Sequence, residues 1–105
     1  MSRKVHNKLV RDKIPDIISA AGQHPTTRVL DDREYLTALI KKLEEELAEF
    51  VSDLSIEELA DIQEVVYAIT TAIGKTTDEL EQARAAKAMK NGVFRNKIFL
   101  KEVSE

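Results

Sequence analysis

Residues 41–64, KKLEEELAEFVSDLSIEELADIQE, decide the fold expected for this chain. The stretch contains two acidic motifs of one form, ELAE at residues 46–49 and ELAD at residues 58–61. Each motif places two carboxylates three residues apart, and residues at that spacing lie on one face of an α-helix. The stretch therefore predicts two consecutive helices, each of which directs a pair of acidic side chains the same way.

The first acid of each motif, Glu46 or Glu58, falls inside the apolar stripe of its helix. On a helical wheel with about 100° per residue, several large apolar side chains lie within roughly 80° of each of these two acids. They include Leu39, Leu43, Phe50, Ile62, Val65 and Ile69. The second acid of each motif, Glu49 or Asp61, lies about 60° to the side, at the edge of the stripe. The two helices thus repeat one design.

Carboxylates in apolar surroundings require a partner, because an unpaired charge there is very costly. If the two helices form a hairpin through the short connection at residues 51–55, their apolar faces meet and the four acids converge. A cluster of carboxylate oxygens suits Mg²⁺, with Mn²⁺ as the alternative, since these hard ions prefer carboxylate and water and keep positions open for substrate phosphates. We expect a metal site formed by Glu46, Glu49, Glu58 and Asp61.

Glu58 has a competing structural role. Ser55 and Glu58 have the spacing of a capping box, in which the carboxylate of Glu58 would accept a hydrogen bond from the backbone N–H of Ser55. This spacing supports the capping role as well as it supports metal ligation. The matching position of Glu46 in the other helix favours the metal.

The remainder of the chain is expected to be mostly helical. Apolar spacing, capping residues and glycine stops predict helices over residues 15–21, 32–53, 55–73 and 76–90. With 105 residues and 43% hydrophobic content the chain suits one core. We expect a single all-α domain over residues 1–105, a hairpin or bundle of about four helices. A short β pairing between residues 28–30 and 98–102 could accompany it.

The composition excludes several classes of protein. The chain has no cysteine, which removes disulfide frameworks, thiolate metal sites and cysteine nucleophiles. No apolar run is long enough for a membrane span, and the N-terminal residues lack the apolar core of a signal peptide. Few aromatic residues accompany the basic segments, so nucleic-acid binding is not expected. We expect a cytoplasmic protein with neither a membrane nor a nucleic acid as its partner.

Charge is distributed unevenly along the chain. Residues 41–64 carry nine acidic and two basic side chains, whereas residues 84–101 carry six basic and none acidic. Residues 3–13 add five basic side chains against one acidic. An acidic centre between basic ends would suit a metal-bound polyphosphate, although a solvated surface explains any single lysine equally well. The candidate phosphate contacts are Lys8, Arg11, Lys87 and Lys97.

These motifs resemble those of a known family. EELAE at residues 45–49 followed by ELAD at 58–61 resembles the acidic signature of the all-α nucleoside triphosphate pyrophosphatase superfamily. That superfamily includes MazG-like proteins, phosphoribosyl-ATP pyrophosphohydrolase and dimeric dUTPases. NKLVRDKIP at residues 7–15 and NGVF at 91–94 are similar to motifs of a small single-domain branch expected to clear non-canonical nucleotides.

The resemblance implies a Mg²⁺-dependent enzyme that converts a nucleoside triphosphate to the monophosphate and pyrophosphate. It implies metal ligation by the four acids of the two motifs. Glu45 matches the leading acid of the family signature, but on the wheel it lies away from the apolar stripe, so we do not expect it to bind the metal directly. Glu46 is the candidate for orienting the attacking water. A homodimer or homotetramer is also implied. The chain departs from the family pattern at Asn91, where arginine is more usual, and in its short spacer of eight residues between the motifs.

The alternative is a non-catalytic helical oligomerisation or interaction module. Its acidic residues would then cap helices and keep the surface solvated, and metal ions would not change its melting temperature. Under either hypothesis the sequence does not identify a base or sugar, and phosphoribosyl-ATP or another nucleotide-like substrate fits the first hypothesis equally well.

Overall fold

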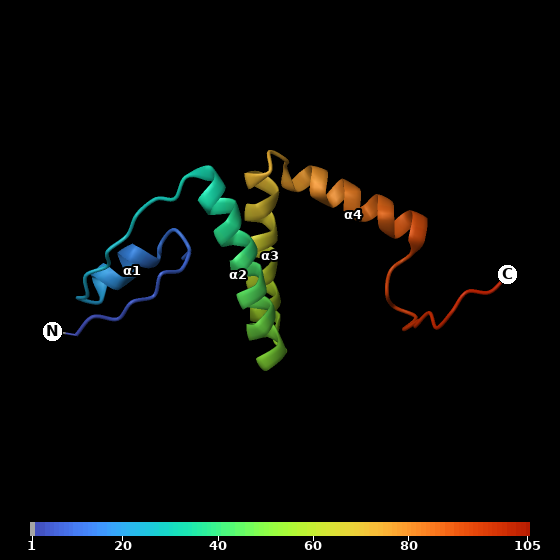
Figure 1. Ribbon diagram of the computed structural model, residues 1–105, viewed down its shortest axis with the longest axis horizontal. Coiled ribbons are helices and arrows are strands. Elements are labelled where there is room, and N and C mark those ends of the chain that lie inside the picture. Colours follow the sequence, from blue (N-terminus) through green and yellow to red (C-terminus); the bar gives the residue numbers. More distant parts are fainter. Residues whose placement is uncertain (1) are drawn as a thin grey trace.

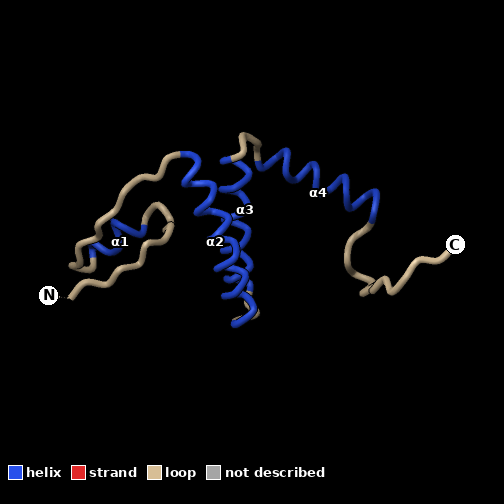
Figure 2. The backbone as a smooth tube through the Cα atoms, viewed as in Figure 1, coloured by secondary structure: helices blue, strands red, loops and turns tan. Residues whose placement is uncertain are grey.

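The computed structural model describes residues 2–105, which form four α-helices (Figures 1 and 2). Their bounds are α1, Ile14–Ala20; α2, Asp32–Ser52; α3, Ile56–Ala72; and α4, Thr77–Asn91. The expected all-α fold is confirmed, and each helix begins and ends close to its predicted position. The described part of the chain contains no strand. Residues 28–30 and 98–102 do not pair, because they lie on opposite sides of the central hairpin (Figure 1).

Local capping explains where α2 and α4 begin. The carboxylate of Asp31 accepts a hydrogen bond from the N–H of Glu34 at 2.8 Å, and the Glu34 carboxylate accepts one from the N–H of Asp31 at 3.4 Å. Thr76 and Glu79 form the same reciprocal box, with both backbone bonds at 3.1 Å. These boxes satisfy N–H groups that the first turn of a helix leaves without a partner.

The centre of the molecule is an antiparallel hairpin of α2 and α3 (Figure 1). Leu39 of α2 and Val65 of α3 are its buried apolar residues, with 3% and 8% of their surfaces exposed. The buried Thr70 satisfies its hydroxyl by donating to the carbonyl of Val66 at 2.8 Å. The core is thin, because each helix covers only part of the apolar face of the other.

A sharp elbow separates α3 from α4. Gly74 has φ of +82°, its N–H donates to the carbonyl of Thr71, and the N–H of Lys75 donates to the carbonyl of Thr70, both at 3.0 Å. This pair of bonds is a Schellman motif, and glycine adopts the left-handed conformation without steric cost. Thr76 then caps α4 at once. The two caps in succession direct α4 away from the hairpin (Figure 1).

The molecule is elongated. Its radius of gyration is 18.6 Å and its extents are 68 × 32 × 23 Å, whereas a compact domain of this length has a radius of gyration of about 13 Å. Among the described helices, α3 contacts α2 and α4, and no other pair is in contact. Within residues 2–105, no helix combines the length and apolar content that a membrane span requires.

Candidate metal centre

Three of the four acids predicted as metal ligands converge on the hairpin. Glu46 of α2 and Glu58 and Asp61 of α3 each place a carboxylate oxygen within 4.8 Å of the others. All three residues are half-buried. The hairpin produces this cluster because α3 runs back along α2 and brings its first turns opposite the second half of α2. Hard divalent cations favour carboxylate oxygens, so the donor set fits Mg²⁺ or Mn²⁺.

Glu49, the fourth predicted ligand, is not part of this cluster. Its side chain is exposed, one turn beyond Glu46 on α2. The wheel does not distinguish Glu49 from Asp61, since each lies about 60° from the first acid of its motif, yet only Asp61 joins the cluster. Its negative charge still acts on the cluster, because Glu49 is among the acids that raise the pKa of Glu58.

The pKa of Glu58 lies above its ordinary value. Partial burial is the largest cause, followed by the negative charges of the neighbouring carboxylates. In order of effect these are Glu49, Asp61, Asp53 and Glu46. Removal from water and proximity of like charges both disfavour the ionised form. The charged form of Glu58 is therefore present at a cost in free energy that a nearby cation would offset.

Only one of the two hydrogen bonds of a capping box forms between Ser55 and Glu58. The hydroxyl of Ser55 accepts a hydrogen bond from the N–H of Glu58 at 3.3 Å, as an N-cap does. The N–H of Ser55, however, donates to the carbonyl of Asp53 at 2.7 Å rather than to the Glu58 carboxylate. The reciprocal contact that defines the complete capping box is thus missing from this helix start. The Glu58 side chain belongs to the acidic cluster instead.

Arg11 connects the N-terminal segment to the acidic cluster. Its guanidinium donates to the Oδ1 atom of Asp61 at 2.7 Å, across fifty residues of sequence. The two side chains are 58% and 41% exposed, so the ion pair lies at the rim of the cluster and not beneath it. Arg11 was predicted as a phosphate contact, and the structure brings it to the carboxylates.

Lys42 is a basic residue beside the acidic cluster that was not predicted from the sequence. Its ammonium lies 3.4 Å from a carboxylate oxygen of Glu46 and 3.7 Å from one of Glu45, one turn away on α2. Side chains four residues apart on a helix are neighbours, so the spacing of Lys42 and Glu46 could have predicted this ion pair. Together with Arg11, Lys42 gives the acidic cluster a basic border.

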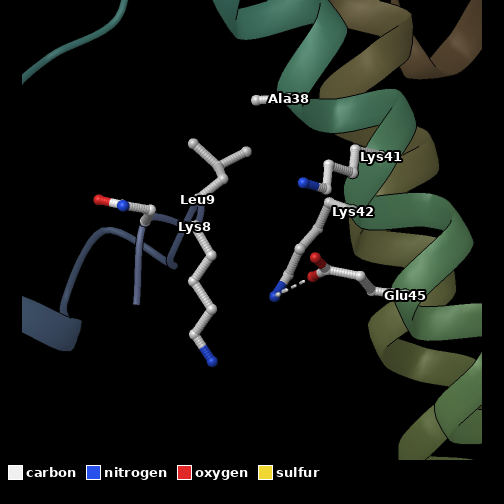
Figure 3. Close-up of a pocket in the computed structure, with 7 residues that line it drawn as sticks. Lys8, Leu9, Ala38, Lys41, Lys42 and Glu45 are labelled. Carbon is white, nitrogen blue, oxygen red and sulfur yellow. Dashed lines mark ion pairs between the residues drawn. The ribbon is translucent and has the colours of Figure 1, made fainter. Parts of the chain in front are cut away.

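Lys8 lies near Lys42 and Glu45 of α2. It lies with Asn7 and Leu9 against α2, where a small hollow of about 60 Å³ is lined by Lys41, Lys42 and Glu45 (Figure 3). The side chain of Lys8 runs alongside the ion pair of Lys42 and Glu45 (Figure 3). Such a hollow is far smaller than the roughly 300 Å³ or more of a typical ligand pocket. It could contact a phosphate group but could not enclose a nucleotide.

The other two predicted phosphate contacts lie elsewhere. Lys87 is in the second half of α4, and Lys97 lies in the tail that follows it, with φ of +59°. Both are exposed. Because α4 leaves the hairpin beyond the last turn of α3, while Glu58 and Asp61 lie in its first turns, neither lysine approaches the cluster within one chain (Figure 1).

Comparisons with known proteins add one partial match. No protein-family profile matches the chain, and no solved structure matches it significantly. A stretch of 42 residues is 55% identical to an uncharacterized protein of Mycolicibacterium smegmatis (strain ATCC 700084 / mc(2)155). The match spans 40% of this chain and 43% of that protein. The chain is therefore similar to a protein without an assigned activity, over less than half the length of either.

Proposed function

We propose that the protein is a Mg²⁺-dependent nucleoside triphosphate pyrophosphohydrolase of the MazG-like class, with Mn²⁺ as an alternative metal. It would convert a nucleoside triphosphate and water to the monophosphate and pyrophosphate, and its substrates would be non-canonical nucleotides. The observation that carries the proposal is the meeting of three half-buried carboxylates from two helices within 4.8 Å. The resemblance of the two acidic motifs to those of the pyrophosphatase superfamily supports it.

Each residue of the cluster has a role in the proposal. Glu46, Glu58 and Asp61 would hold the cation, and Glu49 would join at the margin. The bound cation would neutralise the phosphate charges and help to activate water. Glu46 is the acid proposed to orient the water that attacks the α-phosphorus, because its side chain is only 13% exposed, against 41% for Asp61. Arg11, Lys8 and Lys42 would bind phosphate oxygens, a task suited to basic side chains beside a metal site.

The proposal includes assembly as a homodimer or homotetramer in the cytoplasm. The exposed apolar residues of the hairpin support the assembly, because small helical domains often complete a core by association. Lys87 and Lys97 remain proposed phosphate contacts only if another copy brings them to the cluster.

The direct test is product analysis. The full-length protein would be incubated with a panel of canonical and damaged nucleoside triphosphates in Mg²⁺, in Mn²⁺ and in chelator, and pyrophosphate and monophosphate would be quantified. Equal amounts of the two products, dependent on metal, support the proposed reaction. Release of inorganic phosphate with a diphosphate co-product, or no product from any substrate, contradicts it.

An interaction module is the second candidate, favoured by the large apolar side chains that the described surface exposes. It predicts that Mg²⁺ leaves the melting temperature unchanged. The enzyme proposal predicts a rise, since a ligand that binds only the folded state stabilises it. A melting curve with and without Mg²⁺, matched in ionic strength with NaCl, separates the two.

A further inference from the structure

The chain exposes far more surface than a compact protein of its size. Its accessible area is 10054 Å², whereas a compact monomer of this length exposes about 6,000 Å². The difference is about 4,000 Å² per chain, or about 8,000 Å² for two copies, which exceeds the roughly 2,000 to 5,000 Å² that many obligate interfaces bury in total. A second copy that covered this surface would bury enough area for a stable assembly.

The C-terminal arm, which we define as residues 77–105 and which comprises α4 and the tail after it, is mostly exposed. Helix α4 contains no buried residue. The tail is exposed throughout, and its large apolar side chains are between 64% and 100% accessible. They are Val93, Phe94, Ile98, Phe99, Leu100 and Val103. An isolated chain would present this apolar segment to water, which is unfavourable.

The hairpin carries a matching apolar surface on the side that its own partner helix leaves uncovered. On α2, Ile40, Leu47 and Val51 share one stripe, because their spacing of seven and four residues returns to the same face. The stripe continues over the turn to α3. Its exposed members are Ile40, Leu47, Val51, Leu54, Ile56 and Leu59. We call these six residues the hairpin stripe.

The middle of the arm and the acidic segment of the hairpin also carry opposite charges. Residues 84–101 of the arm have six basic side chains and no acidic one, and residues 41–64 of the hairpin have nine acidic and two basic. Within one chain these segments do not meet. Among the described helices, α4 contacts only α3, next to the elbow that joins them. Charge complementarity steers and aligns two surfaces that also share apolar contacts.

The elbow favours a second copy over the chain's own hairpin. The Schellman motif at Gly74 and the capping box at Thr76 fix the direction of α4 by local hydrogen bonds. Helix α4 has 15 residues and thus carries the start of the tail about 22 Å from the elbow. A return of α4 to its own hairpin would require these caps to break, whereas contact with another copy would leave them intact.

We propose that the C-terminal arm of each copy packs along the hairpin stripe of a second copy, with the apolar tail on the stripe and the basic residues toward the acidic segment. The exchange is reciprocal, as a two-fold dimer requires. This surface goes beyond the proposed hydrolase activity and does not depend on it.

Two measurements test the exchange, both on the full chain without metal or nucleotide, so that failure of the proposed enzyme activity does not affect them. The first is the dissociation constant of the assembly by sedimentation equilibrium for the wild type and for Phe99→Asp. A charge in a buried contact of the arm should weaken association by about 30-fold or more. Ile17→Asp, at an exposed position of α1 outside the arm and the stripe, is the matched control and should leave the constant within about twofold.

The second measurement is disulfide formation between chains. Since the natural chain has no cysteine, the single variants Phe99→Cys and Leu54→Cys can be mixed and oxidised without background. The exchange predicts a mixed disulfide dimer, and mass spectrometry would identify the cross-linked peptides. A monomeric wild type, a Phe99→Asp variant that associates as tightly as the wild type, or a Phe99→Cys/Leu54→Cys double variant whose disulfide forms within one chain would overturn the proposal.

Discussion

Replacement of Arg11 by glutamine should tighten the binding of a divalent cation to the acidic cluster. The guanidinium pairs with Asp61 at 2.7 Å, and a cation that takes this carboxylate must first compete with that pair. The two side chains are 58% and 41% exposed, so the pair is a surface ion pair worth about 0.2 to 1 kcal/mol. Its removal should therefore raise the affinity for metal by a factor of about 1.4 to 5.

Calorimetric titration of Mn²⁺ at low ionic strength measures this change, because added salt would screen an exposed pair. The matched control is Arg28→Gln. Arg28 also forms an exposed pair, with Glu34 at 2.9 Å, but that pair lies at the start of α2 and away from the cluster. Arg28→Gln should leave the Mn²⁺ affinity equal to that of the wild type.

Weaker Mn²⁺ binding by Arg11→Gln, or the same affinity as Arg28→Gln, would refute this reasoning. The first result would mean that Arg11 supports the bound cation, and the second that the pair of Arg11 with Asp61 does not oppose metal binding. If Arg11 moves from the carboxylate to a phosphate when metal arrives, the same variant should raise KM for the triphosphate while its metal affinity rises.

Other predictions concern charge and core. Glu58→Gln should raise the melting temperature of the metal-free protein at pH 7, because the raised pKa of Glu58 means that its charged form destabilises the fold. The difference in melting temperature from the wild type should shrink as pH falls toward 4.5. No difference at pH 7 would show that Glu58 acts only as a favourable cap. Glu34 should titrate at about 2 by carboxyl NMR, mainly because the hydrogen bond from Arg28 lowers its pKa. The stabilising effect of that pair should be complete above about pH 4.5 and be lost as pH falls toward 2, and an ordinary pKa in the NMR titration would contradict it. Leu39→Ala should lower the free energy of unfolding by about 2 to 5 kcal/mol in urea denaturation, since Leu39 is the most buried apolar residue of the hairpin; a loss below about 1 kcal/mol would show that the hairpin core does not depend on it.

The helices could be predicted from the sequence because their determinants are local. Capping at Asp31 and Thr76 and the glycine at residue 74 act over four or five residues, and apolar periodicity acts over a few turns. The convergence of Glu46 with Glu58 and Asp61 followed from the same periodicity together with a short connection. The absence of Glu49 from the cluster was not predicted, because the wheel gives it the same edge position as Asp61.

The contacts that the sequence did not predict depend on tertiary structure or on competition between close partners. The pairing of Arg11 with Asp61 joins an irregular segment to α3, and neither periodicity nor spacing indicates it. At the start of α3, the carbonyl of Asp53 takes the N–H of Ser55 that a complete capping box would use. The β pairing expected from apolar residues near both ends does not form, since the elbow carries the tail away from residues 28–30.

The most direct test of the proposed metal-dependent hydrolase compares two neighbouring acids. Glu58 belongs to the carboxylate cluster, whereas Glu57 is exposed beside it in the first turn of α3. Pyrophosphate release in Mg²⁺ should fall by more than about 100-fold in Glu58→Gln, since even residues that only support metal ligands contribute about 10- to 100-fold. Glu57→Gln should keep wild-type activity with the same Mg²⁺ dependence. Equal activity of the two variants would contradict the assignment of the cluster as the metal centre.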